Sequence, residues 1–190
     1  MLRLLPAMLL AVLLLAACDD DANAPNPPQL SEDYDVYSAL LDQHFTADQT
    51  ERVVILDSTE VYDLSHPDMR QYLITNLGVT EATLQSYDTA NTAKRQLQKK
   101  FDTIAEAILI NESDFRVILD QGGWEEFHTQ YPKSSGLITL SGVGYAADGN
   151  TAIVYASNMV GFLAGSGICV VLERTVDGWN VMNYTIVWVS

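Results

Sequence analysis

The sequence predicts an α+β domain in which helices precede an antiparallel sheet. Four segments in the last third are rich in Val, Ile, Thr and aromatic residues, which favour strands: 137–145, 151–157, 168–175 and 181–189. Asp-Gly pairs follow the first and the third of these segments, and Asp-Gly between strands is a strong hairpin signal. Upstream, apolar residues repeat at helical spacing. We therefore expect N-terminal helices packed on one face of a C-terminal four-stranded antiparallel meander.

The upstream region alternates between helical and strand-like patterns. Ser31 can cap a helix that runs to about Thr46, and the apolar segment 52–56 that follows it predicts a buried strand. Pro67 suits the first position of the next helix, and Gly78 is placed to end that helix.

Two further helical regions are expected before the meander. Thr80 can cap a helix to about Thr89, and residues 107–110 favour a strand. Short helices are expected at 112–119 and 124–130, because Gly122-Gly123 interrupts the pattern between them.

The N-terminus has the pattern of an export signal. Arg3 is the only charged residue before Asp19, and the residues between them are almost all apolar. This apolar segment is shorter than the roughly 20 residues that cross a bilayer comfortably. Leu15-Ala16-Ala17-Cys18 resembles the lipobox of bacterial lipoproteins. The resemblance implies cleavage after residue 17 and attachment of fatty acyl groups, such as palmitate, to Cys18; the alternative is an ordinary cleaved signal with a chance cysteine.

The resemblance also predicts where the chain works. Residues 1–17 would form the signal peptide, and residues 18–30 a Pro-rich acidic stalk that begins at the lipidated cysteine. Residues 31–190 would form one domain. Asp19 directly after Cys18 resembles an inner-membrane retention signal, which implies the periplasmic face of that membrane, with the outer membrane as the alternative.

The charge of the chain excludes one class of partner. The formal net charge is −15, and removal of Arg3 with the signal changes it to −16. Nucleic-acid binding needs clustered Lys and Arg, so we expect no nucleic-acid partner. Lys94, Arg95, Lys99 and Lys100 form the one basic cluster, which is either a site for an anionic partner or a solvated face. Cys169 has no partner if Cys18 carries lipid, and its apolar neighbours predict burial.

Two groups of residues are candidates for a binding surface. We expect exposed aromatic residues and a Gly-rich connection to favour contact with an envelope protein or a small ligand, and the candidates are Trp124, Phe127, Tyr131, Gly161, Gly165 and Gly167. The alternative for residues 161–167 is a bulged hairpin connection. The polar segment 57–60 follows a predicted strand, where it can line a cleft or form a solvated loop.

Motifs for catalysis, metals and cofactors are absent from the sequence. An envelope hydrolase could use Asp57, Glu125, Glu126 or His128 in a cleft, but the zincin pattern of two histidines four residues apart with a neighbouring Glu does not occur. The Gly-rich segment lacks both the phosphate-loop ending and the Gly-x-Ser-x-Gly pattern. We therefore expect no metal and no cofactor.

The domain itself resembles a group of uncharacterised bacterial proteins. The resemblance covers roughly residues 34–190 and is strongest in 124–145, around Tyr131-Pro132 and Val143-Gly144-Tyr145. Arg often stands in that group where this chain has Gly142, so a role of that Arg would be absent here. The resemblance implies one α+β domain and brings no assigned activity with it. A cystatin-like or NTF2-like arrangement is a further analogy of fold alone. We expect a lipid-anchored, non-enzymatic binding or assembly module, with a hydrolase or a structural lipoprotein as alternatives.

Overall fold

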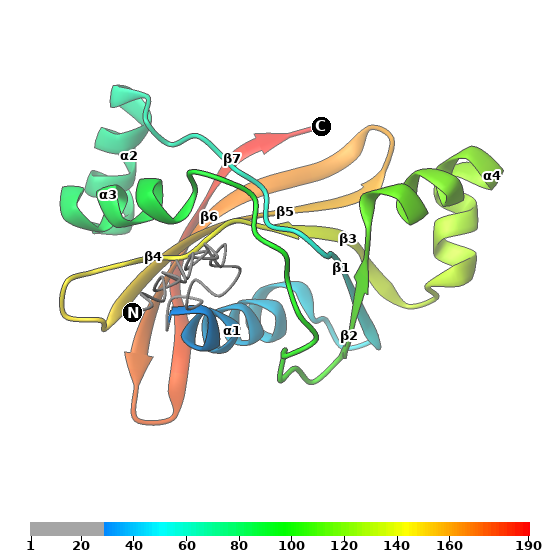
Figure 1. The fold of residues 1–190 in the computed structure, drawn as a ribbon, viewed down its shortest axis with the longest axis horizontal. Helices are drawn as coiled ribbons and strands as arrows, with labels where there is room; N and C mark the ends of the chain where they lie inside the picture. The colour runs from blue at the N-terminus through cyan, green and yellow to red at the C-terminus, as the bar shows by residue number, and fades with distance from the viewer. Residues whose placement is uncertain (1–28) are drawn as a thin grey trace, which may run out of the picture.

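A mixed sheet of seven strands forms the centre of the protein, and helices lie on both of its faces (Figure 1). The computed structural model describes residues 29–190, with side chains from residue 32. The predicted signal peptide, the lipidation site Cys18, Asp19 and the stalk to residue 28 lie outside the described residues. The α+β class predicted from the sequence is confirmed.

Seven strands and four α-helices make up the described chain. The helices are α1 (Gln29–Leu40, extended by one π-helical turn, Leu41–Phe45), α2 (Pro67–Leu77), α3 (Glu81–Ala90) and α4 (Glu112–Gln130). The strands are β1 (Arg52–Leu56), β2 (Glu106–Ile110), β3 (Ser134–Leu140), β4 (Gly144–Tyr145), β5 (Thr151–Gly161), β6 (Ala164–Thr175) and β7 (Gly178–Val189).

The sheet is larger than the predicted four-stranded meander. Its strand order is β2-β1-β3-β5-β6-β7, and β4 pairs with β5 next to β3. The antiparallel part from β3 to β7 corresponds to the predicted strands, but β1 and β2 extend it by parallel pairing. Parallel strands are joined by a long crossover connection, so a short turn sequence of the kind that predicts a hairpin does not occur between them.

Two segments of the predicted meander, 137–145 and 161–167, have a different structure from the one expected. The segment 137–145 is interrupted at residues 141–143 and forms β3 and β4. The glycine-rich segment 161–167 is mostly strand, because Gly161 pairs with Ala164 across a tight turn next to a register shift in β5. The alternative of a bulged hairpin connection is therefore the correct description.

The faces of the sheet explain how the helices are distributed. On β5, Val154 packs in the cluster beneath α1, whereas its neighbours Ile153 and Tyr155 pack in the cluster beneath α2 and α3. Successive residues of a strand point to opposite faces. On β1, Val54 points to α4 and lies opposite the α1 face. The expectation that the helices cover one face was thus wrong: α1 covers one face, and α2, α3 and α4 cover the other.

The helix ends agree with the sequence signals. Pro67 is the first residue of α2, and Gly78 ends this helix with a left-handed φ of 71°. The Thr80 side chain accepts a hydrogen bond from the Thr83 N–H and so caps α3. Gly123 divides α4 with φ 66° and ψ −148°, a conformation that only glycine adopts readily. Cys169 is fully buried in β6, as predicted.

Among the described helices, none is long and apolar enough to cross a membrane.

Candidate functional site

A cavity of about 390 Å³ lies where β1 ends, between the N-terminal half of α4 and the sheet. Its walls come from α4, from the ends of β1 and β3, and from the segment around Lys94. Small-ligand sites are typically clefts of about 300–1,000 Å³, mostly apolar with a few polar groups. The cavity at the end of β1 is therefore the candidate site.

The apolar wall of this cavity consists of Leu56, Phe115, Leu119 and Leu137. Leu56 is the last residue of β1, and Leu137 lies on the face of β3 that α4 covers. Phe115 and Leu119 are four residues apart, so they lie on the same side of α4. All four belong to the hydrophobic cluster beneath α4, where they pack against buried side chains.

The Glu60 carboxylate and the Thr139 hydroxyl belong to the polar wall, and the Ser157 hydroxyl lies next to Thr139 without lining the cavity. The Thr139 hydroxyl donates to Glu60 Oε2 at 2.8 Å and lies 2.6 Å from the Ser157 hydroxyl. Thr139 has one hydroxyl proton and gives it to Glu60, so Ser157 is the donor to Thr139. Thr139 and Ser157 are buried and Glu60 is half-buried. Among the described side chains, none forms an ion pair with Glu60.

Two cations and a second carboxylate lie at the outer edge of the cavity. Arg116 pairs with Glu112 at 2.5 Å along the helix, and both side chains are largely exposed. Lys94 is exposed and forms no ion pair with any side chain that the structure describes. Of the two cations at the cavity, Arg116 is therefore ion-paired with Glu112, whereas Lys94 has no ion-pair partner among the described side chains.

The segment that carries Lys94 is held beside the loop that carries Glu60. The Thr59 N–H donates to the Arg95 carbonyl at 2.8 Å, and the Arg95 N–H donates to Thr59 Oγ1 at 2.9 Å. The Leu97 N–H donates to the Asp57 carbonyl at 2.6 Å. These bonds fix the backbone on two sides of the cavity relative to each other.

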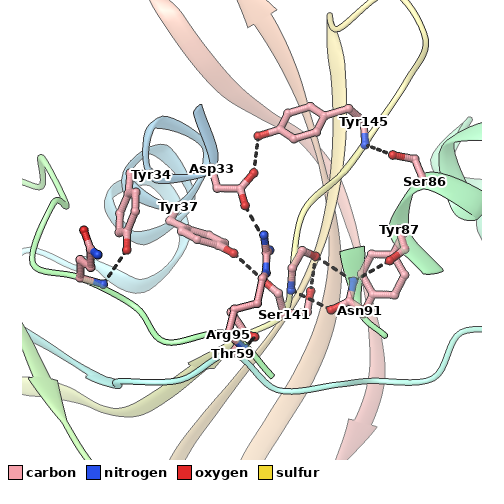
Figure 2. Close-up of polar contacts among 12 residues, drawn as sticks. Asp33, Tyr34, Tyr37, Thr59, Ser86, Tyr87, Asn91, Arg95, Ser141 and Tyr145 are labelled. Atoms are coloured by element: carbon pink, nitrogen blue, oxygen red, sulfur yellow. Dashed lines mark hydrogen bonds and ion pairs between the residues drawn. The ribbon is translucent and has the colours of Figure 1, made fainter. Parts of the chain in front are cut away.

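An ion pair between the half-buried Arg95 and the buried Asp33 anchors this segment to α1 (Figure 2). Arg95 Nη2 lies 3.1 Å from Asp33 Oδ2, and the Tyr145 hydroxyl donates to Asp33 Oδ1 at 2.9 Å. Burial raises the pKa of the Asp33 carboxyl above its usual value, and the Arg95 charge and the Tyr145 hydrogen bond oppose that shift. Burial and the neighbouring Asp33 raise the pKa of Tyr145, so its hydroxyl stays a donor.

A second set of buried hydrogen bonds holds the break between β3 and β4 in the same region (Figure 2). The Asn91 amide donates to the Gly142 carbonyl at 3.0 Å and accepts from the Gly142 N–H at 2.7 Å. A Cβ on Gly142 would lie 2.6 Å from the Ala90 carbonyl oxygen and 2.7 Å from the Arg95 guanidinium. This chain therefore has no room for a larger side chain at residue 142, because the Arg95 guanidinium and the Ala90 carbonyl lie where its Cβ would be.

The predicted aromatic surface is largely inside the protein. Trp124 and Phe127 are buried in the cluster beneath α4, and Tyr131 is half-buried against it. The expectation that Trp124 and Phe127 are exposed was wrong, because the kink at Gly123 turns the second half of α4 onto the sheet. A hydrophobic face at helical spacing does not by itself reveal whether it packs or binds.

Two of the three predicted glycines make room for neighbouring side chains. A Cβ on Gly165 would meet the Met159 side chain, and a Cβ on Gly167 would meet the Trp188 ring. A Cβ on Gly161 would touch only Ala164 at 3.4 Å. The exposed groups of this connection are instead Phe162 and Leu163 at the hairpin tip.

The four candidate acid–base residues lie outside the cavity: three are close together on α4, and Asp57 follows β1. Among the described residues, no hydrogen bond joins any two of Asp57, Glu125, Glu126 and His128, and none of the four lines the cavity. His128 Nε2 lies 3.1 Å from the Val160 carbonyl, and Glu126 accepts from Gln130. The part of the chain that the structure describes holds no group of three or more His, Cys, Asp or Glu side chains arranged for a metal ion.

The sequence indicated only part of the cavity. Ser58, Thr59 and Glu60 line it, which agrees with the cleft alternative for the polar segment 57–60, whereas Asp57 does not. Of the basic cluster, Lys94 lines the cavity, Arg95 binds Asp33, and Lys99 and Lys100 are exposed. Phe115, Leu119 and Thr139 were not singled out, because a helix face and a strand position carry no local mark of a cavity.

Comparison of the chain with protein-family models, with curated proteins and with solved structures finds no match.

Proposed function

We propose that this protein is a lipid-anchored binding module of the cell envelope that holds a small ligand in the cavity at the end of β1. The observation that carries the proposal is the combination of an apolar wall with convergent polar groups, Glu60 and Thr139, in a cavity of about 390 Å³. Such a combination is typical of ligand sites. The anchor in the proposal is Cys18, with the periplasmic face of the inner membrane as its location and the outer membrane as the alternative.

The proposal is for a binding role and not for a hydrolase. Hydrolysis by acid–base chemistry needs two groups within hydrogen-bonding reach of one substrate, and none of the four candidate residues lines the cavity. A cystatin-like or NTF2-like relationship, in which helices on a sheet leave a groove, remains part of the proposal as an analogy of fold.

Native mass spectrometry of the full chain, extracted gently from its membrane, tests the binding role. The wild type should retain a small molecule, and Leu119→Trp, which fills the cavity from its half-buried wall, should lose it. Val117→Trp is the matched control, because Val117 lies on the same helix, is exposed and does not line the cavity. Equal retention by both variants would contradict the proposed site.

The same measurement tests the anchor. Acyl groups should add mass to the wild type, and Cys18→Ser should abolish that added mass and release the protein from the membrane fraction. One acyl chain alone binds a membrane only marginally, so two or three chains are expected. A wild-type chain without added mass, recovered in the soluble fraction, would overturn the anchor without bearing on the cavity.

A further inference from the structure

We infer that the cavity at the end of β1 takes a zwitterionic ligand with an apolar side chain, such as a short apolar peptide. This inference rests on the proposed binding function and names the class of its ligand. It depends on three features of the cavity: a carboxylate and a cation that have no ion-pair partner among the described side chains, and an apolar wall.

Glu60 is the group that selects the positive end of the ligand. Its carboxylate is half-buried beside the apolar wall, and among the described residues its side chain has one hydrogen bond, from Thr139. A partly desolvated carboxylate without a cation has lost hydration that one neutral hydrogen bond does not fully replace. Ser157 donates to the Thr139 hydroxyl and Thr139 donates to this carboxylate, which leaves Glu60 as an acceptor. An ammonium group of the ligand would supply the missing charge-assisted hydrogen bonds.

Lys94 is the group that selects the negative end. Arg116 also lines the cavity, but Glu112 holds its guanidinium at 2.5 Å. Lys94 has no such partner among the described side chains, and hydrogen bonds in residues 59 and 95 fix the neighbouring backbone. A carboxylate of the ligand would therefore meet Lys94 while its ammonium group meets Glu60.

The balance of charge favours a ligand without net charge. The charged side chains that line the cavity are Glu60, Glu112, Lys94 and Arg116, two of each sign. A fatty acid would leave Glu60 unpaired and add a third anion, and a cationic amphiphile would leave Lys94 unpaired. A zwitterion satisfies both groups at once.

The apolar wall and the volume favour an apolar side chain on a small ligand. Leu56, Phe115, Leu119 and Leu137 offer a surface without hydrogen-bonding groups, so a polar side chain placed there would lose its hydration without compensation. The volume of about 390 Å³ lies near the lower end of the range for small-ligand sites. A dipeptide therefore suits the cavity better than a long chain does.

Isothermal titration calorimetry of the full chain with Leu-Leu dipeptide tests the inference. Leu-Leu should bind saturably, and N-acetyl-Leu-Leu, which lacks the ammonium group, should bind about tenfold more weakly or worse. Glu60→Gln should weaken Leu-Leu by a similar factor and remove the difference between the two peptides. Lys94→Gln should likewise weaken the binding of Leu-Leu by a similar factor and remove the difference between Leu-Leu and its C-terminal amide.

The controls separate recognition from folding. Glu173→Gln and Lys99→Gln remove one exposed charge of each sign away from the cavity and should leave the binding of Leu-Leu unchanged. Thermal unfolding of Glu60→Gln monitored by circular dichroism shows whether this variant folds. If it does not, the comparison of free and acetylated peptide on the wild type still decides the question.

The failure of this inference differs from the failure of the proposed function. Equal binding of free and acetylated peptide would overturn recognition of a zwitterion. No binding of Leu-Leu, together with a retained molecule that Leu119→Trp loses, would overturn the ligand class and leave the binding function in place. No retained molecule and no peptide binding would overturn both.

Discussion

Single side chains from distant parts of the sequence determine the polar region beside the cavity. Arg95 connects α1 to the segment that carries Lys94, because its side chain binds Asp33 and its backbone binds Thr59. Breaking a buried ion pair leaves an uncompensated charge and is costly, whereas an exposed pair contributes little. Asp33 is 1% exposed, so its partners matter far more than those of the exposed pairs elsewhere in the chain.

Tyr145→Phe should reduce the free energy of unfolding by about 1–3 kcal/mol at neutral pH, because it removes a hydrogen bond to a buried charged group. Denaturant unfolding measures this loss, and Tyr184→Phe is the control, since Tyr184 is 48% exposed and its hydroxyl makes no hydrogen bond within the described chain. Equal losses for the two variants would refute the role given to Tyr145.

The same variant should also change the dependence of stability on pH. The folded pKa of Asp33 is raised above its model-compound value of 3.8, so the folded state binds more protons than the unfolded state between the two pKa values. The contribution of Asp33 to stability therefore falls as pH rises through that interval. The Tyr145 hydrogen bond lowers the pKa of Asp33 in the folded state. In Tyr145→Phe this pKa is higher, so the decrease in stability with rising pH continues to a higher pH. The loss of stability caused by Tyr145→Phe should therefore be smaller at pH below 3.8 than at pH 7.

At the scale of elements, the kink in α4 places two different surfaces of one helix on the sheet. The first half supplies Phe115 and Leu119 to the cavity, and the second half buries Trp124 and Phe127. The rings of Phe115 and Trp124 contact each other edge to face across the kink, with centroids 5.7 Å apart. The change of direction at Gly123 allows both halves to pack on the sheet.

Gly123→Ala should therefore destabilise the fold by about 1–3 kcal/mol, the usual cost of a side chain in a sparsely populated backbone conformation. A Cβ there would also lie 3.3 Å from the Phe162 ring. Urea denaturation should show a lower midpoint for Gly123→Ala, whereas the control Gly161→Ala adds an ordinary contact and should change it little. A Gly123→Ala midpoint equal to that of the wild type would show that the kink carries no strain.

At the scale of the whole molecule, negative charge dominates. The chain has 25 acidic and 10 basic side chains and a formal charge of −15. Most of the ion pairs among the described side chains lie on the surface, where each contributes little to the free energy of unfolding. The excess negative charges repel one another, and this repulsion destabilises the folded state. This charge also disfavours adsorption to anionic lipid headgroups, which is consistent with a proposed anchor that is covalent.

Added salt should therefore stabilise the protein. Raising NaCl from about 0.02 M to about 0.5 M shortens the screening length several-fold and should raise Tm by about 2–4 °C, which corresponds to about 1 kcal/mol for a chain of this size. Circular dichroism during heating measures the change. The double variant Asp120→Asn/Glu173→Gln removes two exposed negative charges and should respond less. A Tm that falls with salt would mean that the ion pairs outweigh the repulsion.

The sequence by itself determined the local structure of this protein. Pro67, Gly78, Thr80 and Gly123 mark the ends or the break of helices because each acts on its own backbone or on that of the next few residues. The α+β class, the helices and most strands follow from such signals and from periodicity. The polar segment after β1 was recognised for the same local reason.

Only the tertiary structure decided the sheet and the site. Thr139 binds Glu60 across 79 residues, Arg95 binds Asp33 across 62, and Tyr145 binds Asp33 across 112. The parallel pairing of β1 with β2 and β3, the helices on both faces and the burial of Trp124 likewise depend on partners distant in sequence. A local pattern states that a residue is apolar or polar. Which surface covers it, and whether a cavity remains, depends on how all the elements pack together.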